Sequence, residues 1–285
     1  MLVILGALIV IGSVIGGFMM AGGNPLSLIV ISEYVVICGS ALGAMVTMAP
    51  MKVIMDMVKQ IIGALKGSPF NKKCYEELFK ALYELFMLGR RNGMVALEEH
   101  VGNPGSSSIF SKYPSLAKNH HALDFLCSGL RPIIDGKCKP DQLKMLLDLE
   151  LAALESEHHK PLDVLNKTSD AMPGFGIVAA VLGIVITMAS IAGPVEEIGH
   201  HVASALVGTF LGILISYGFL APLAVNMGFN GDAEMCYMRC VASSVVGFTN
   251  GMAPVMAVEG ARRGLDSGVK PSSDELDAML KGIGK

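Results

Sequence analysis

Long uninterrupted runs of apolar residues dominate the pattern of this chain. Between residues 1 and 50 the only charged side chain is Glu33, and between residues 172 and 229 the only ones are Glu196 and Glu197. A helix of about 20 apolar residues rises roughly 30 Å, which matches the hydrocarbon core of a bilayer. The runs therefore predict membrane spans, which must be helical because lipid cannot satisfy the backbone N–H and C=O groups.

The apolar runs predict four spans arranged as two hairpins. The spans are expected at residues 2–20, 34–51, 174–192 and 202–225, and the second could begin earlier, within residues 26–31. The alternative for the first run is a cleaved signal peptide. A retained span is the preferred interpretation, because the run lacks the basic residues that precede the apolar part of such peptides.

The same pattern predicts the fold class and the segment boundaries. We expect an all-α membrane protein with four transmembrane helices and a helical cytoplasmic extension. The expected segments are a first transmembrane hairpin at residues 1–51, a cytoplasmic helical loop at 52–171, a second transmembrane hairpin at 172–228 and a cytoplasmic tail at 229–285.

Helical periodicity continues outside the apolar runs. Apolar side chains recur at helical spacing at Tyr75, Leu78, Phe79, Leu82 and Phe86. A break is expected at Asn92-Gly93, followed by a short helix from residue 94 to about residue 100. Further helices are expected at residues 114–134 and 140–159, and the second of these leads toward the third span. No strand-rich region is expected.

The distribution of basic residues predicts the orientation. All 22 Lys and Arg residues fall within residues 52–167 and 239–285, and the two short connecting loops contain none. Basic residues mark the cytoplasmic side, so we expect an inner-membrane protein with both termini in the cytoplasm. Residues 241–258 are interpreted as a cytoplasmic helix pair rather than a fifth span, because Asn250, Gly251 and Pro254 interrupt them.

Composition supports the membrane assignment and offers little enzyme chemistry. Hydrophobic residues make up 52% of the chain and charged residues 16%, with a net charge of -3. The chain has no P-loop, no dinucleotide-binding glycine motif, no GxSxG elbow and no HExxH motif. We therefore expect no enzyme activity, no cofactor other than a transported ion, no metal site and no nucleic-acid partner.

Two acidic and histidine-rich clusters have ordinary structural interpretations. The cluster at Glu155, Glu157, His158 and His159 is interpreted as a solvated helical face, because neighbours in a helix point in different directions. A second cluster is expected to cap the outer end of the fourth span and comprises Glu196, Glu197, His200 and His201. The six cysteines are expected to be free thiols in a reducing compartment.

The predicted spans are rich in small residues and poor in polar ones. Glycine pairs four residues apart, which allow close helix packing, occur at Gly12 and Gly16, Gly39 and Gly43, and Gly208 and Gly212. The polar side chains expected inside the membrane are Thr187, Ser190, Ser204, Thr209, Ser216 and Tyr217. Intramembrane ionisable groups usually mark ion movement. None is expected here, so either the chain moves no ions or a partner helix supplies the titrating group.

Several separate motifs resemble the MotA family of flagellar motor stator subunits, within the MotA/TolQ/ExbB proton channel family. They comprise Val207-Gly-Thr-Phe-Leu-Gly-Ile-Leu-Ile-Ser-Tyr-Gly-Phe-Leu-Ala-Pro222 in the fourth span, Met172-Pro-Gly-Phe-Gly-Ile-Val-Ala-Ala-Val-Leu-Gly-Ile-Val185 in the third, Arg90-Arg-Asn-Gly-Met-Val-Ala-Leu-Glu98 and the tail Asn250-Gly-Met-Ala-Pro-Val-Met-Ala-Val-Glu259. The resemblance covers essentially the whole chain, with the motifs in the family's order.

The resemblance implies a function and a set of partners. Five subunits of this type would surround two copies of a MotB-like partner, which is anchored to peptidoglycan and supplies the pore aspartate. The assembly would conduct protons and turn ion flow into torque on the rotor protein FliG, while lipid surrounds the outer helices.

The resemblance also implies roles for individual residues. On the ion pathway it places Pro173 and Pro222, the pore-lining Thr209, and Ala180, where sodium-driven members carry a hydroxyl group. Thr187 is a further candidate on that pathway. The rotor-contact charges are Arg90, Arg91, Glu98, Glu99 and Glu150.

Two other classes of protein compete with this interpretation. An ExbB/TolQ-like energy transducer of the cell envelope would share the two final spans, but such proteins have three spans in total. A solute transporter or a membrane scaffold is disfavoured, because the chain shows no inverted repeat and no pair of broken helices.

Overall fold

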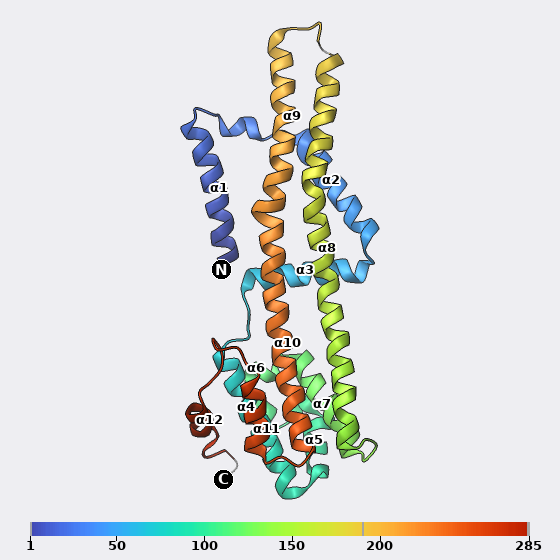
Figure 1. Ribbon diagram of the computed structural model, residues 1–285, viewed down its shortest axis with the longest axis vertical. Helices are drawn as coiled ribbons and strands as arrows, with labels where there is room; N and C mark the ends of the chain where they lie inside the picture. Colours follow the sequence, from blue (N-terminus) through green and yellow to red (C-terminus); the bar gives the residue numbers. More distant parts are fainter. Residues whose placement is uncertain (1, 190, 284–285) are drawn as a thin grey trace. The chain divides into compact units, whose positions relative to one another are not determined.

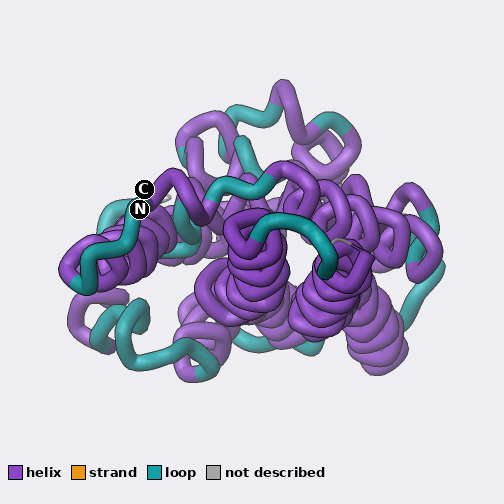
Figure 2. Tube along the Cα trace, turned by 90° about the horizontal axis from the view of Figure 1, so that it is seen from above, coloured by secondary structure: helices purple, strands orange, loops and turns teal. Residues whose placement is uncertain are grey.

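The computed structural model describes residues 2–189 and 191–283, and throughout these residues the regular elements are helices, with no strand (Figures 1 and 2). The chain divides into two compact units. Unit 1 comprises Met1–Gly67 and Glu157–Asn230, and unit 2 comprises Ser68–Ser156 and Gly231–Lys285. The all-α fold is confirmed. Ser190, which was expected inside the third span, lies outside the described residues.

Unit 1 begins with two apolar helices joined by a short connection. Helix α1 spans Leu2–Met20, a 3-10 turn η1 spans Pro25–Leu28, and α2 spans Ile31–Met48. The second span therefore starts and ends about three residues earlier than predicted. It ends before Pro50 because the residue ahead of a proline avoids the α conformation, and Ala49 is extended. Helix α3, Met51–Lys66, starts immediately after that proline.

Unit 1 also contains a hairpin of two longer helices, which lie side by side in both views (Figures 1 and 2). Helix α8 spans Pro140–Ala189 and α9 spans Val195–Ile215. A π-helical turn, η5 at Ser216–Leu220, then leads into α10 at Ala221–Thr249. Among the described residues, four helical segments are long and apolar enough to cross a membrane, as predicted: Leu2–Met20, Pro25–Met48, Pro140–Ala189 and Val195–Thr249.

Helix α8 is longer than the sequence pattern indicated. The predicted helix at 140–159 and the third span form one continuous helix that passes through Pro161 and Pro173. A proline removes one backbone hydrogen bond, but a helix continues where neighbouring groups satisfy the freed carbonyl. No glycine and no pair of turn-forming residues lies between the two predicted segments. The prolines alone therefore do not end the helix.

Unit 2 is a helical cluster around α4, Lys72–Asn92. The predicted apolar stripe is confirmed, because Tyr75, Leu78, Phe79, Leu82 and Phe86 are each at most 1% exposed. The surrounding elements are η2 (Met94–Leu97), α5 (Glu98–Gly102), η3 (Pro104–Ser106), η4 (Phe110–Lys112), α6 (Pro114–Ala117), α7 (His120–Ile134), α11 (Pro254–Arg263) and α12 (Ser273–Leu280).

Two helix boundaries in unit 2 refine the predictions. The predicted helix at 114–134 is two helices, because the side chain of Asn119 accepts a hydrogen bond from the backbone N–H of Ala122 and starts α7 as its cap. The predicted break within residues 241–258 is present, but the first helix of the predicted pair is the end of α10, which starts at Ala221. Helix α10 ends before Gly251, whose φ of 89° favours glycine, and α11 begins at Pro254.

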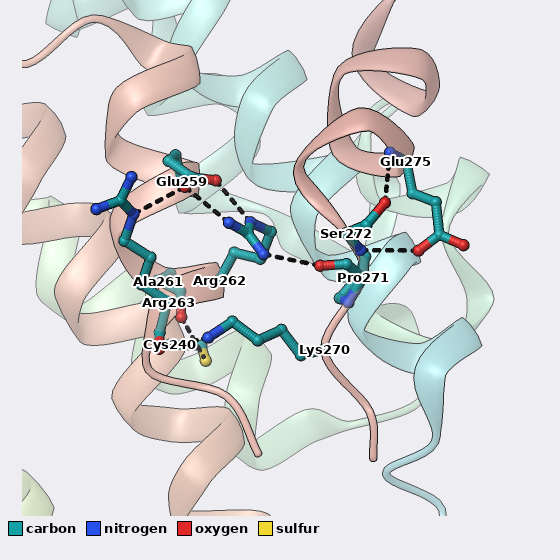
Figure 3. Close-up of polar contacts among 9 residues, drawn as sticks. All are labelled: Cys240, Glu259, Ala261, Arg262, Arg263, Lys270, Pro271, Ser272 and Glu275. Atoms are coloured by element: carbon teal, nitrogen blue, oxygen red, sulfur yellow. Dashed lines mark hydrogen bonds and ion pairs between the residues drawn. The ribbon is translucent and has the colours of Figure 1, made fainter. Parts of the chain in front are cut away.

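A buried ion-pair cluster holds the C-terminal segment of unit 2 (Figure 3). The guanidinium of Arg262 donates to both carboxylate oxygens of Glu259, at 2.6 and 2.8 Å, and to the backbone oxygen of Pro271 at 2.8 Å. Arg263 adds one further bond to Glu259 at 2.8 Å, but its side chain is 74% exposed, against 11% for Arg262. Arg262 therefore links α11 to the segment that leads into α12.

Replacing Arg262 by alanine should release this segment, whereas Arg263→Ala should leave it in place. Removing one partner of a buried pair leaves a buried charge, which typically costs about 3–5 kcal/mol, while an exposed pair contributes about 0–1 kcal/mol. We expect amide hydrogen exchange in residues 264–283 to rise at least about tenfold in Arg262→Ala only. Equal exchange in the two variants would contradict this role of Arg262.

The pH dependence of the same cluster has a definite sign. Hydrogen bonds from Arg262, and then from Arg263, lower the pKa of Glu259 from 4.5 to about 2. The cluster thus stabilises unit 2 fully above the ordinary pKa of a carboxyl group, and this stabilisation is lost as the pH falls toward 2. Protection of the backbone amides of residues 264–283 against hydrogen exchange should therefore be full above about pH 4.5 and decrease as the pH falls toward 2.

Candidate functional site

The α8–α9 pair of unit 1 packs backbone against backbone through glycines. A Cβ atom at Gly212 would lie 2.7 Å from the carbonyl oxygen of Met172 and 2.9 Å from Cα of Gly176. A Cβ at Gly176 would in turn lie 2.9 Å from the carbonyl oxygen of Gly208. Small residues allow transmembrane helices this close approach. The predicted packing role of Gly208 and Gly212 is therefore fulfilled within one chain.

The other predicted glycine pairs have a different environment. A Cβ atom at Gly12, Gly16, Gly39 or Gly43 would meet no atom within 4 Å. Helix α1 has no buried residue in the described chain, although its sequence is almost entirely apolar. In a membrane these surfaces of α1 and α2 must face lipid or other protein chains.

Pro173 is compensated by a hydrogen bond from the neighbouring helix. Having no N–H, Pro173 leaves the carbonyl oxygen of Ser169, four residues earlier, without its usual helical donor. The hydroxyl of Ser216 donates to this oxygen at 2.7 Å, and the hydroxyl of Ser169 lies 3.3 Å from the carbonyl oxygen of Ser216. Both serines are at most 2% exposed. This exchange ties the proline of α8 to the π-helical turn that precedes Pro222.

The predicted ion-path residues of α8 lie along one stripe. Pro173, Ala180 and Thr187 are spaced by seven residues, which keeps them near one helical face. Pro173 and Ala180 are half-buried, whereas Thr187 is 2% exposed and its hydroxyl donates to the carbonyl oxygen of Gly183 at 2.8 Å. In the isolated chain the hydroxyl of Thr187 is thus occupied by its own helix.

Two predicted ion-path residues lie outside α8, and one of them, Thr209, lies near this stripe. Thr209 of α9 is half-buried, and its Cα would lie 3.3 Å from a Cβ atom at Gly176. Pro222 is exposed and is the second residue of α10, which begins at Ala221 directly after the π-helical turn. A π-helical turn often marks a functional site. The assignment of these residues to an ion path stays a prediction.

The sequence analysis missed one residue of this region, Glu33. With the second span expected at residues 34–51, Glu33 lies just outside it, and no ionisable group is expected inside the spans. The structure instead puts Glu33 in the first turn of α2, 5% exposed and against Gly208 of α9. The signal was available, because Glu33, Ile37 and Ala41 recur every four residues and so share the buried face of α2.

Four of the candidate rotor-contact residues are exposed on unit 2 and are called here the charged corner: Arg90, Arg91, Glu98 and Glu99. Arg90 and Arg91 end α4, and Glu98 and Glu99 begin α5. The packing of Leu97 on Gly89 holds the two helix ends together, since a Cβ atom at Gly89 would lie 3.1 Å from Cδ1 of Leu97. Two cations and two anions are thereby presented near the junction of α4 and α5.

Glu98 also borders a small cavity of about 250 Å³ between α5 and α7. Arg131 and Asp135 of α7 line it with Glu98, so charges of both signs surround this hollow. Glu150, the fifth predicted contact residue, lies on α8 and is exposed. It belongs to a different element from the charged corner.

The remaining clusters have structural roles in the part of the chain that is described. Glu155 forms an ion pair with Arg239 at 3.1 Å, and Glu157 pairs with Lys52 at 3.5 Å. Glu196 and Glu197 occupy the first turn of α9, where negative charge interacts favourably with the helix dipole, but the N-cap residue is Pro194 and no side chain caps the helix by a hydrogen bond. All six cysteines are free thiols, and no group of three metal-ligating side chains occurs among the described residues.

The long apolar helices among the described residues define a multi-spanning helical membrane protein. The sequence model of the MotA/TolQ/ExbB proton channel family matches residues 117–229, which include the α8–α9 pair. A second model, described as Motility protein A N-terminal, matches residues 4–93, which include α1, α2 and the two arginines of the charged corner.

Full-length relatives identify the family within this class. The chain is 38% identical to motility protein A of Salmonella typhimurium strain LT2 over 283 residues, which cover 99% of this chain and 96% of the relative. It is 34% identical to chemotaxis protein LafT of Vibrio parahaemolyticus over 276 residues, which cover 97% of each chain. The chain therefore belongs to the motility protein A family, and it is an inner-membrane protein.

Solved structures have the same fold. A chain of the C. jejuni MotAB structure superimposes with a TM-score of 0.78 at 20% identity, covering 95% of this chain and 98% of that chain. A chain of the flagellar MotAB stator complex from Bacillus subtilis gives a TM-score of 0.73 at 22% identity, covering 96% and 98%.

Proposed function

We propose that this chain is a stator subunit of the bacterial flagellar motor, which forms with a MotB-like partner a proton-conducting complex that drives the rotor. The observation that carries the proposal is full-length membership of the motility protein A family. The role is that of an ion-channel subunit rather than an enzyme. An ExbB/TolQ-like transducer is disfavoured by the match of residues 4–93 to the Motility protein A N-terminal model.

Several features of unit 1 support an assembly of more than one chain. The open glycine pairs of α1 and α2, together with the exposed apolar face of α1, suit contacts between copies of this chain, of which we propose five. The half-buried Ala180 and Thr209 suit a pore wall facing a partner helix. That helix, from a peptidoglycan-anchored subunit, would supply the aspartate that carries the proton.

The proposed coupling ion is the proton. The methyl group of Ala180 offers no oxygen to a sodium ion, which prefers oxygen ligands. One charge that crosses 100 mV releases about 2.3 kcal/mol, so torque would be built from many small steps. Each step would neutralise the partner's carboxylate, change helix contacts and turn the ring of subunits by a small angle.

The charged corner is the proposed contact with the rotor protein FliG, and both termini of the chain are proposed to be cytoplasmic. Two cations and two anions near the junction of α4 and α5 suit electrostatic engagement, which favours fast and specific association over tight binding. Glu150 would extend this contact from α8. The exposed cations, and the absence of Lys and Arg from the two short connecting loops, agree with this orientation.

Rotation of single tethered motors tests the proposed function. A strain that lacks this gene should rotate only when the gene is restored together with that of its partner. A proton uncoupler should stop rotation, removal of sodium should not, and replacement of the partner's aspartate by asparagine should abolish it. Continued rotation with the asparagine variant would overturn the mechanism, and rotation without this gene would overturn the function.

A further inference from the structure

The acidic side chain of Glu33 is buried where three helices of unit 1 meet. It lies in the first turn of α2, and 5% of it is exposed. Gly208 of α9 and Ala179 of α8 complete the junction, since a Cβ atom at Gly208 would lie within 3.2 Å of both neighbouring side chains. The motility protein A roles discussed above leave this acid without a function.

The carboxyl group occupies space that exists because residue 208 is glycine. A Cβ atom at Gly208 would lie 2.3 Å from Oε2 and 3.2 Å from Cδ of Glu33, and 3.1 Å from Cβ of Ala179. Oε2 is fully buried and accepts no hydrogen bond from any residue that the structure describes. The acid is therefore fitted closely into a site that offers it no donor.

No neighbouring charge offsets an ionised carboxylate at this position. On α2 the adjacent titratable group is Tyr34, and α8 carries none between residues 172 and 189. On α9 the first titratable side chain outward from Gly208 is His201, seven residues away and so roughly 10 Å along the axis. Further out on α9 lie His200, Glu197 and Glu196. An ionised group without donor or counter-charge inside a membrane protein is costly, and such groups usually serve ion movement.

The position of the acid relates it to the candidate ion path. Gly208, against which the acid packs, and Ala179, which packs on the same glycine, directly precede Thr209 and Ala180 in the sequence. The carboxyl group thus lies behind the α8–α9 wall at the level of those two residues. A movement of α2 relative to α9 is what would bring water to it.

We propose that Glu33 is a proton-binding site on the ion path, neutral while α2 packs against Gly208 and ionised when the two helices separate enough for water to reach Oε2. On release the O–H bond of the acid breaks, the proton passes to a water molecule and the electron pair stays on Oε2; uptake is the reverse. The part of the proposal that concerns ion passage rests on the proposed function, whereas the protonation of the packed acid does not.

Infrared spectroscopy of the complex with its partner, reconstituted in lipid at neutral pH, tests the protonation. We expect the C=O stretching band of a neutral carboxylic acid, and its loss in Glu33→Gln. If that variant does not assemble, Glu33→Asp serves instead, because it keeps an acid but shifts the band. A spectrum in which neither variant changes this band would overturn the proposal.

The variant Gly208→Ala tests the position of the carboxyl group, because the added methyl group would overlap with the carboxyl group of Glu33. We expect this variant to shift or abolish the band, and Gly199→Ala on the same helix to leave it unchanged, because a Cβ atom there meets nothing within 4 Å. An unaltered band in Gly208→Ala would contradict the buried position of the acid.

Single-motor speed tests the role in ion passage. We expect Glu33→Gln motors to turn more slowly than wild type in alkaline medium, where protons are scarce, and to approach wild-type speed in acidic medium. Equal speeds at every pH would overturn the role of Glu33. If instead the wild-type gene failed to restore rotation to the deletion strain, the proposed function would fall while the infrared result would still stand.

Discussion

A Gly212→Ala variant is expected to abolish swimming and to remove most of the assembled complex from the membrane. The added methyl group would lie 2.7 Å from the carbonyl oxygen of Met172 and within 3.1 Å of two backbone atoms of Gly176. Backbone atoms of two packed helices cannot rotate away as a flexible side chain can. The α8–α9 pair must therefore separate, which breaks the close packing that holds transmembrane helices together.

The separation would also damage the contacts one turn away. The hydrogen bond from the Ser216 hydroxyl to the Ser169 carbonyl, at 2.7 Å, depends on the same spacing of the two helices. Its loss would leave the carbonyl freed by Pro173 without a donor in a buried site, at a cost of about 1–3 kcal/mol. Pro173 and Pro222 of the candidate ion path would then no longer keep their present positions relative to each other.

Gly174→Ala is the matched control for this prediction. Gly174 lies on α8 two residues from Gly176, but a Cβ atom there meets nothing within 4 Å. Membrane fractions probed for the assembled complex, together with swimming in soft agar, should separate the two variants. Wild-type assembly and swimming of Gly212→Ala would show that the two helices are not packed as described.

Charge reversal at the charged corner is expected to remove torque without removing the complex. Arg90→Glu and Glu98→Lys should each slow swimming, and a variant that also reverses Arg91 and Glu99 should stop it. All four side chains are exposed, and exposed substitutions usually change stability by within about 0.5 kcal/mol. The complex should therefore still assemble and conduct protons while it fails to engage the rotor.

The control for this prediction is a pair of reversals elsewhere on the chain. Lys144 and Asp148 are exposed on α8, four residues apart, and belong to no candidate contact. Lys144→Glu with Asp148→Lys should swim as wild type does. Normal swimming of the fourfold variant at the charged corner would place the rotor contact elsewhere on the molecule.

The spans and most helices could be predicted from the sequence, because they depend on local patterns. Apolar runs predict the four spans, and the apolar stripe from Tyr75 to Phe86 predicts α4. Boundaries were less certain wherever proline was involved. At Pro173 the helix could either end or continue. Its continuation depends on a donor for the carbonyl oxygen of Ser169, and that donor, Ser216, lies 47 residues from Ser169 in the sequence.

The roles of single polar residues could not be predicted, because they depend on which helices meet. Glu33 was visible as an isolated charge, but its burial follows from Gly208 on another helix. The ion pair of Arg262 with Glu259 could be guessed from their three-residue spacing. Its bond to the backbone of Pro271 could not, since no sequence pattern shows where the chain returns.

The central claim is that this chain forms the wall of a proton conduit whose carrier acid comes from a partner chain. The carboxyl group of Glu33 does not replace that acid, because it is buried against Gly208 while α2 and α9 are packed together. Proton flux into liposomes under an imposed potential tests the claim directly. We expect flux from the chain reconstituted with its partner and none from the chain alone; an equal flux from the chain alone would contradict the account.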